Sequence, residues 1–458
     1  MGVTFCPGCF DKQQRIDQLE QENQRLKQQL RYRHRQAEEG FFGSSTPSSK
    51  IPLKPPTAEE NRSHPGGAQA GHAGHGRKSL AASQADHLET RSAPSLCPDC
   101  GGPLQDKGIR LRSVLDCPPL KAQQIVYRLE KKYCPRCRRS LQAQAPGVLP
   151  KHLLGNQLIT RVLLLHYRDG IPLGTVSEQL GVPFGTLVQM LHRLASLFQA
   201  VVPYLIQHYR LSSVRHADET GWRNDGRSGY AWLFATPTLS LFLFRDSRSA
   251  RVPQQVLGDQ PLAGVLVVDR YNGYNRAPCN LQYCYAHLLR EVEDLVKQFP
   301  DHPEVAAFTA TLIPLLAASM HLRSQPLSDP DYYTQAQQLQ QQIQTVMAQP
   351  AQHLGIRRIQ DLFTDNAHRL YHWVQQRKVP ADNNRAEREL RPTVIARKVS
   401  FGSQSDSGAK TREILMSLIH TLTKRVADPE AHLKRALDQL ALDPKLDPLS
   451  LLFPPDTS

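Results

Sequence analysis

Two apolar segments that each run into an acidic residue constrain the fold of this chain most. LSSVRHA is followed by Asp218 and Glu219, and GVLVV is followed by Asp269. Because side chains alternate across a strand, Asp218 shares one face with Val214 and His216. Sheets present functional groups at the carboxyl ends of their strands, so the pattern predicts two strands whose terminal acids meet at one site. The structural alternative is that each acid caps a turn.

The residues between these two segments predict the element order β-β-β-α-β. SGYAWLFATP and LSLFLFRD are typical of a hairpin, and SARVPQQVLG of a short helix. Two carboxylates about 4 Å apart would repel each other by roughly 4 kcal/mol at an effective dielectric constant near 20. A divalent cation removes this repulsion, and Mg²⁺ is the usual choice where phosphates are handled. The two acids therefore predict a metal site.

A third acid for such a site is expected in PADNNRAERELRPTVIARK, residues 380–398. A helix capped by Asp382 would place Glu387 on the same face as Asn383 and Asn384, with Glu389 on the opposite side. The alternative is a solvated charged helix with i,i+4 ion pairs. Basic residues surround the candidate acid, namely Arg388, Arg391, Arg397 and Lys398. Of these, Arg388, Arg391 and Lys398 are candidate DNA contacts.

Cysteine spacing predicts a zinc ribbon. CPDCGG at 97–102 and CPRCRR at 134–139 are two CxxC pairs with 33 residues between them. Four thiolates from two such pairs make a tetrahedral Zn²⁺ site, and a redox dithiol is the alternative. The predicted ligands are Cys97, Cys100, Cys134 and Cys137. Basic residues crowd this module, among them Arg138 and Arg139, which are candidate DNA contacts.

The amino-terminal segment predicts a short coiled coil. Ile16, Leu19, Asn23, Leu26 and Leu30 follow 3,4 spacing, and a buried Asn at an a position typically selects a parallel two-stranded coil. An ordinary polar helix is the alternative. Residues 36–92 are rich in Ser, Pro, Gly and His and are expected to form a disordered linker.

Residues 157–200 have a helical pattern that includes PLGTVSEQLGVPFGTLVQMLHRL. A helix, a turn with Gly and a second helix suggest a helix-turn-helix, with Phe184 to Arg193 as the recognition helix and Arg193 as a DNA contact. Any helical hairpin would give a similar pattern.

The charge of the chain favours a polyanionic partner. The formal net charge is +14, and residues 1–150 alone hold 23 Lys+Arg against 14 Asp+Glu. We identify no apolar run close to the ~20 residues that span a bilayer and no signal peptide, so we expect a cytoplasmic protein without a membrane segment.

HADETGWR, VVDRYNGYN, CYAHLLRE and DNNRAERELRP, in this order, resemble the insertion sequence 66 family of bacterial transposases. The resemblance covers about residues 10 to 425. It implies a multidomain α/β protein with an RNase H-like (retroviral-integrase-like) core of the DDE type, whose triad would be Asp218, Asp269 and Glu387 with Mg²⁺ or Mn²⁺. His287 and Arg290 would contact the DNA backbone near this site, or serve packing.

With this resemblance, the sequence divides into eight expected segments. They are a CxxC pair with a short coiled coil (1–35), a disordered linker (36–92), a zinc ribbon (93–148), a helix-turn-helix region (149–205), the first part of the core (206–296), a helical insertion (297–379), the second part of the core (380–425) and a helical tail (426–458).

The implied function is DNA transposition: cleavage at the terminal inverted repeats of an insertion sequence and transfer of the freed strands to target DNA. Expected partners are these DNAs, further copies of the chain in a homodimer or larger oligomer, and small accessory proteins of the element, at the nucleoid of a bacterium. Two rivals remain, a DNA-binding regulator without catalysis and an RNase H-like nuclease that does not join strands.

Overall fold

The computed structural model describes Leu19, Glu22 and residues 95–96, 99–103, 121–136 and 138–453 of the chain. The chain forms two units, residues 53–121 and the remainder. In the first of these, an isolated bridge between Leu96 and Pro103 closes the turn that contains Cys100. The predicted linker lies outside the described residues, and so does the coiled-coil seam apart from Leu19, which is helical.

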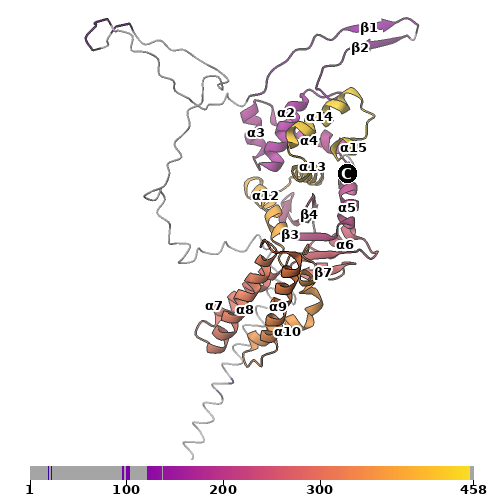
Figure 1. Ribbon diagram of the computed structural model, residues 1–458. Coiled ribbons are helices and arrows are strands. Elements are labelled where there is room, and N and C mark those ends of the chain that lie inside the picture. The colour runs from indigo at the N-terminus through magenta and orange to yellow at the C-terminus, as the bar shows by residue number, and fades with distance from the viewer. Residues whose placement is uncertain are drawn as a thin grey trace, which may run out of the picture. The chain divides into compact units, whose positions relative to one another are not determined.

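A five-stranded mixed sheet forms the centre of the larger unit (Figure 1). The strand order is β5-β4-β3-β6-β7; β3 pairs antiparallel with β4 and parallel with β6. The strands are β3 (Val214–Asn224), β4 (Arg227–Thr236), β5 (Leu239–Arg245), β6 (Val265–Val268) and β7 (Asn280–Tyr283). The expected order β-β-β-α-β is present, with α6 (Arg251–Leu257) before β6. Strand β7 was not predicted from the sequence.

Helices cover both faces of this sheet, which explains why β4 and β5 are almost continuously apolar and buried. On one face, α5 (Val201–Leu211) packs on the sheet, with Tyr209 against Phe234. On the other face lies α12 (Asn384–Ser400), whose Arg397 donates to the Thr220 hydroxyl. The sheet is therefore the middle layer of the larger unit.

The outer edge of β5 is covered by polar side chains of α13 (Asp406–Arg425). Backbone N–H groups of Ser240, Phe242 and Phe244 donate to Thr421, Ser417 and Glu413 respectively. Four helical residues rise about 6 Å and two strand residues about 6.6 Å, so i,i+4 side chains match alternate strand amides. The edge amides are thus satisfied without a neighbouring strand.

Short helices precede the sheet: α2 (Asn156–Leu163), the π-helical η3 (Leu164–Arg168), α3 (Leu173–Leu180) and α4 (Phe184–Leu197). Helix α3 ends at Gly181, whose left-handed φ of +65° allows the turn into α4. Helix α4 packs on α13 (Figure 1). Upstream, β1 (Lys131–Cys134) and β2 (Arg139–Gln142) form an antiparallel hairpin.

A group of helices lies between β7 and α12. They are α7 (Tyr285–Gln298), α8 (Pro303–Leu322), α9 (Asp329–Met347), α10 (Leu354–Asp365) and α11 (His372–Gln375), with the 3₁₀ turn η5 (Ala367–Arg369). After α13, α14 (Pro429–Leu442) packs on α2 through the Asp438–Asn156 hydrogen bond, and α15 (Pro448–Leu452) follows.

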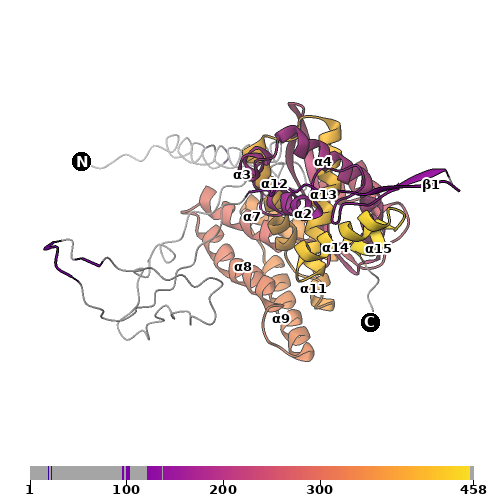
Figure 2. The same cartoon turned by 90° about the horizontal axis from the view of Figure 1, so that it is seen from above.

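The expectation that no segment is apolar and long enough to cross a membrane needs correction at α8. By length and composition it could do so, alone among the helices of the described residues. In the structure it packs against α7 and α9, as Figures 1 and 2 show, and Val305, Leu312 and Leu316 are fully buried. One face of α8 therefore contributes to the core of the helical group.

Candidate active site

The register of the sheet sets Asp218 and Asp269 side by side. Strands β3 and β6 are paired up to His216 and Val267, and each acid follows two residues later on its own chain. An equal step along two parallel strands keeps both side chains on one face and adjacent. Both are buried, at 3% and 8% exposure. The expectation that β3 ends at Asp218 is wrong, because β3 continues to Asn224 through its pairing with β4.

The two carboxyls are held in an environment that disfavours their charged forms. Burial, and then the nearby charges of Glu219, Asp269 and Glu387, raise the pKa of Asp218 well above its ordinary value. Burial and Glu219 raise the pKa of Asp269 to about 7, although the Tyr271 N–H and Arg248 oppose this shift. A cation bound between them would relieve this cost, so the donor set fits a divalent metal.

Helix α12 begins beside β3 because Asn383 ties the two together. The buried Asn383 side chain donates to the Ala217 carbonyl at 2.8 Å, and its Oδ1 lies 2.9 Å from Nδ1 of His216. The predicted cap is one residue too early, because Asn383 is the N-cap and α12 begins at Asn384; the Asp382 carboxylate still accepts from the Asn384 N–H. This anchoring fixes the first turn of α12, and with it Glu387, close enough for the Glu387 charge to raise the pKa of Asp218.

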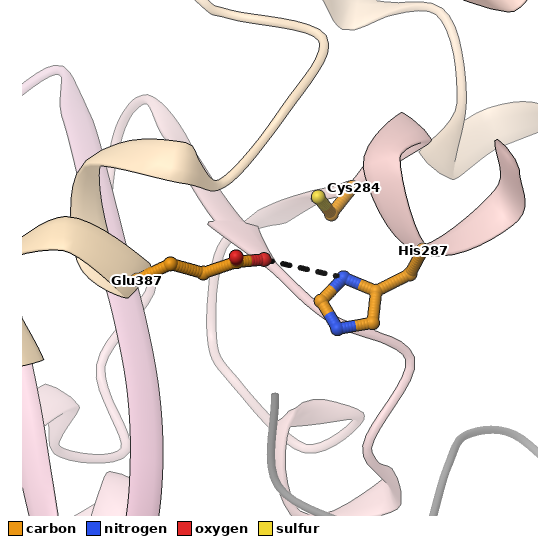
Figure 3. A group of neighbouring side chains, drawn as sticks. All are labelled: Cys284, His287 and Glu387. Atoms are coloured by element: carbon orange, nitrogen blue, oxygen red, sulfur yellow. Dashed lines mark ion pairs between the residues drawn. The ribbon is translucent and has the colours of Figure 1, made fainter. Parts of the chain in front are cut away.

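The Glu387 carboxylate faces α7 (Figure 3). Arg290 donates to its two oxygens at 3.1 and 3.2 Å, and Nδ1 of His287 lies 3.8 Å away. For both residues the sequence left open a contact with the DNA backbone or a packing role; in the structure they pair with Glu387. The Glu387 carboxylate contributes to the raised pKa of Asp218. However, the carboxylate oxygens of Glu387, Asp218 and Asp269 do not all lie within 4.8 Å of one another.

Glu387 forms such a group with Cys284 and His287 instead (Figure 3). Burial, with Arg290 and Arg270, lowers the pKa of His287 to about 3, so its ring is neutral near pH 7. Burial and Glu387 raise the pKa of the Cys284 thiol to about 12. The sulfur already accepts the Asn383 N–H at 3.1 Å. Cys284 is therefore a protonated thiol with a structural hydrogen bond at the edge of the site.

Glu219, which was not predicted as a site residue, stabilises the loop after Asp269 from the opposite face of β3. Its fully buried carboxylate accepts from Arg248 at 2.6 and 2.8 Å and from the Tyr274 hydroxyl at 2.6 Å. The Arg248 guanidinium lies 3.9 Å from the ring centre of Tyr271, whose N–H donates to Asp269 at 3.0 Å. Two contacts therefore fix the loop after Asp269. The sequence signal for Glu219 was its position directly after Asp218 in HADETGW.

Glu389 lies away from this cluster, as its helical position predicted. It accepts from the Ser240 hydroxyl at 2.8 Å and from Lys424 at 2.6 Å. Of the predicted DNA contacts on α12, Arg388, Arg391 and Lys398 are exposed.

The remaining predicted positions lie upstream of the sheet. Arg193 is hydrogen-bonded to the Lys151 carbonyl. Arg138 is exposed, and Arg139 begins β2. Among the predicted zinc ligands, Cys100 is exposed and Cys134 ends β1, whereas Cys97 and Cys137 lie outside the described residues.

Comparison with known proteins gives a family for the parts of the chain that hold these acids and the paired cysteines. The family model described as Transposase IS66 family matches residues 151–411, more than half of the chain, and includes all three acids. The chain belongs to this family. A second model, the zinc-finger binding domain of transposase IS66, matches residues 94–138 and with them the four predicted zinc ligands. A transposase role and a structural zinc are thereby supported, and a DDE family implies a divalent metal.

Similar proteins occur in Sinorhizobium fredii. The chain is 28% identical to the uncharacterized protein y4jD over 46% of its own length and 43% of that protein's length. It is 25% identical to the uncharacterized protein y4qI over 80% of its own length and 74% of that protein's length. For the uncharacterized protein y4hP, the identity is 21% over 77% and 71% of the two lengths. The first match thus spans less than half of the relative.

Proposed function

We propose that this IS66-family protein binds the ends of its element and performs metal-dependent DNA cleavage and strand transfer with Asp218, Asp269 and Glu387. The observation that carries the proposal is the parallel register of β3 and β6, which sets two buried carboxyls together beside the start of α12. In this proposal the sheet order β5-β4-β3-β6-β7 is that of an RNase H-like core. The helices between β7 and α12 are its insertion.

The chain's own groups would perform the positioning. Asp218 and Asp269 would hold Mg²⁺ or Mn²⁺, which polarises the phosphodiester and favours the attacking hydroxyl in an in-line displacement. Glu387, which accepts from Arg290 in the structure, would be the third carboxylate to hold this cation. Arg290, beside Glu387, would pair with a DNA phosphate.

DNA recognition is assigned to the segments before the core. The zinc ribbon (93–148) and the helix-turn-helix region (149–205) would bind the terminal repeats, with α4 as the recognition helix and Arg193 as a contact. Exposed Arg388, Arg391 and Lys398 would contact phosphates beside the site. The segment 1–35 would dimerise, small accessory proteins of the element would join the complex, and the protein would act at the nucleoid in the cytoplasm.

A 3′-end joining assay tests this function. Full-length protein, Mg²⁺ and a pre-cleaved element end should give strand-transfer products, and Glu387→Gln should lower their rate by several orders of magnitude. Glu389→Gln is the matched control on the same helix. It can retain the Ser240 hydrogen bond and should keep most activity, at some cost in stability because Lys424 loses its carboxylate.

Three outcomes would contradict the proposal. Full activity in Glu387→Gln would remove this residue from the site. Equal loss in both variants, with folding intact, would point to a general role of α12 instead of the carboxylate. Cleavage without joined product would favour the nuclease alternative, and DNA binding without either reaction would favour the regulator.

A further inference from the structure

A second site lies on α13, away from the acids. A cavity of about 140 Å³ lies between α4 and the first turns of α13. The residues that line it include His166, His192, Ser403, Gly408, Thr411 and Arg412. None of its lining residues is acidic. One water molecule needs about 10–15 Å³ of such space, so the cavity has room for a small tetrahedral anion.

Arg412 is the charged residue of this cavity, and it is only 8% exposed. Its Nη2 lies 3.2 Å from Nε2 of His166, and its guanidinium lies 5.4 and 5.2 Å from the ring centres of Tyr167 and Trp222. Nδ1 of His166 lies 2.9 Å from the Ile171 carbonyl, so Nδ1 carries the proton and Nε2 accepts from Arg412. Within the described part of the chain, no carboxylate pairs with Arg412.

The electrostatics agree with an uncompensated cation. Burial lowers the pKa of Arg412, and Tyr167 alone opposes this. Burial and Arg412 together lower the pKa of His166 to about 4, so this ring is neutral near pH 7 and adds no second positive charge. Buried arginines are normally paired, because an isolated buried charge is costly. The two aromatic rings offset only part of that cost.

We propose that this cavity is a phosphate-binding site, in which Arg412 and the amino-terminal turns of α13 hold a phosphate of the DNA backbone. The planar guanidinium matches phosphate geometry, and the site lies near the positive end of the α13 dipole, where the Ser405 hydroxyl already accepts the Gly408 N–H. The Thr411 hydroxyl, 2.7 Å from Nδ1 of His192, lines the same cavity.

A phosphodiester suits the site better than a protein carboxylate. The opposite wall comes from α4, the proposed recognition helix, and the chain carries a net charge of +14. The choice of DNA as the source of the phosphate rests on the proposed function. A phosphate held between α4 and α13 would add affinity without reading sequence.

The anion itself is tested first, with inorganic phosphate and the full-length protein. At constant ionic strength, replacing chloride by phosphate should raise the melting temperature, because a ligand that binds only the folded state stabilises it. Arg412→Gln should lose this rise. Arg425→Gln is the matched control, since Arg425 lies at the other end of α13 and also lies over two rings, those of Tyr204 and Phe453.

Gly408→Asp keeps the test decisive if Arg412→Gln folds poorly. An Asp at residue 408 lies four residues before Arg412 on the same helix, so its carboxylate can pair with the Arg412 guanidinium in place of a bound anion. The new Cβ would lie 3.3 Å from Oγ of Ser405, so a small shift of that hydroxyl accommodates it. This variant should melt at a higher temperature than wild type and should no longer respond to phosphate. An unchanged response to phosphate in Gly408→Asp would overturn the site.

DNA binding identifies the source of the phosphate. The plot of log affinity against log salt concentration should lose about 0.9 from its slope in Arg412→Gln, equally for terminal and random duplexes. An unchanged slope in a protein that binds DNA, or stabilisation by acetate but not by phosphate, would overturn the proposal. A phosphate response that depends on Arg412 in a protein without DNA affinity would support the anion site and contradict the proposed function instead.

Discussion

Replacing Asp269 by Asn should stabilise the metal-free protein, and by an amount that depends on pH. The carboxyl is buried, and its pKa is raised from 3.8 to about 7 on folding. Between these values the folded state binds one proton more than the unfolded state, so stability falls as pH rises through the window. Asn has no such proton and can still accept the Tyr271 N–H through its Oδ1.

The size of the effect follows from the same linkage. The advantage of Asp269→Asn should grow by about 1.4 kcal/mol per pH unit up to about pH 7, reach on the order of 4 kcal/mol, and then level off. Thermal unfolding in EDTA at pH 5 to 9 measures it, with Asp301→Asn, an exposed residue before α8, as the control. Mg²⁺ at pH 8 should raise the melting temperature of wild type but not of Asp269→Asn.

A pH-independent difference between wild type and Asp269→Asn would refute this reasoning. Destabilisation by Asn in EDTA at pH 8 would do so more strongly, since it would mean that the charged carboxylate is favourable in the folded state without a metal.

Four further predictions concern other parts of the chain. Cys134→Ser should release one zinc per chain and unfold the ribbon, which metal analysis and limited proteolysis measure; a wild type without zinc would contradict it. Ser417→Ala should cost about 1–3 kcal/mol in urea unfolding, because the buried N–H of Phe242 loses its acceptor. Deleting residues 1–35 should lower the number of chains per complex, obtained from the solution mass and the mass of one chain; an unchanged number would exclude the coiled-coil dimer. Arg193→Ala should weaken binding of terminal DNA, with equal loss on random DNA if it meets phosphate and selective loss if it reads a base.

The strands of the core could be predicted from the sequence because they are short, apolar and bounded by turns. Strand β7 could not, since its four residues, NLQY, carry no alternation that distinguishes them from a loop. The end of β3 was placed too early at Asp218. Its pairing with β4 continues past the acids, and pairing between strands is a tertiary property that the local pattern of one strand does not contain.

The acids of the candidate site were predicted from position and family resemblance, but their partners were not. Arg290 reaches Glu387 across 97 residues of sequence, and Arg248 reaches Glu219 across 29. Neither separation follows a helical or strand period, so only the folded chain brings these groups together. Arg412 is a similar case: within α13 it has the spacing of an ordinary helical arginine, and its burial depends on η3 and β3.

The cover that α13 gives to β5 has a consequence during synthesis of the chain. Ser417 emerges 175 residues after Phe242, the amide it satisfies. At about 5–20 residues per second, the interval between the synthesis of β5 and that of Ser417 is on the order of 10 to 35 s, and during this time α13 does not cover the edge of β5. During that interval the edge could pair with another nascent copy, and translation of many copies at once would favour such pairing. The yield of folded protein should therefore depend on expression rate and on chaperones that bind extended segments.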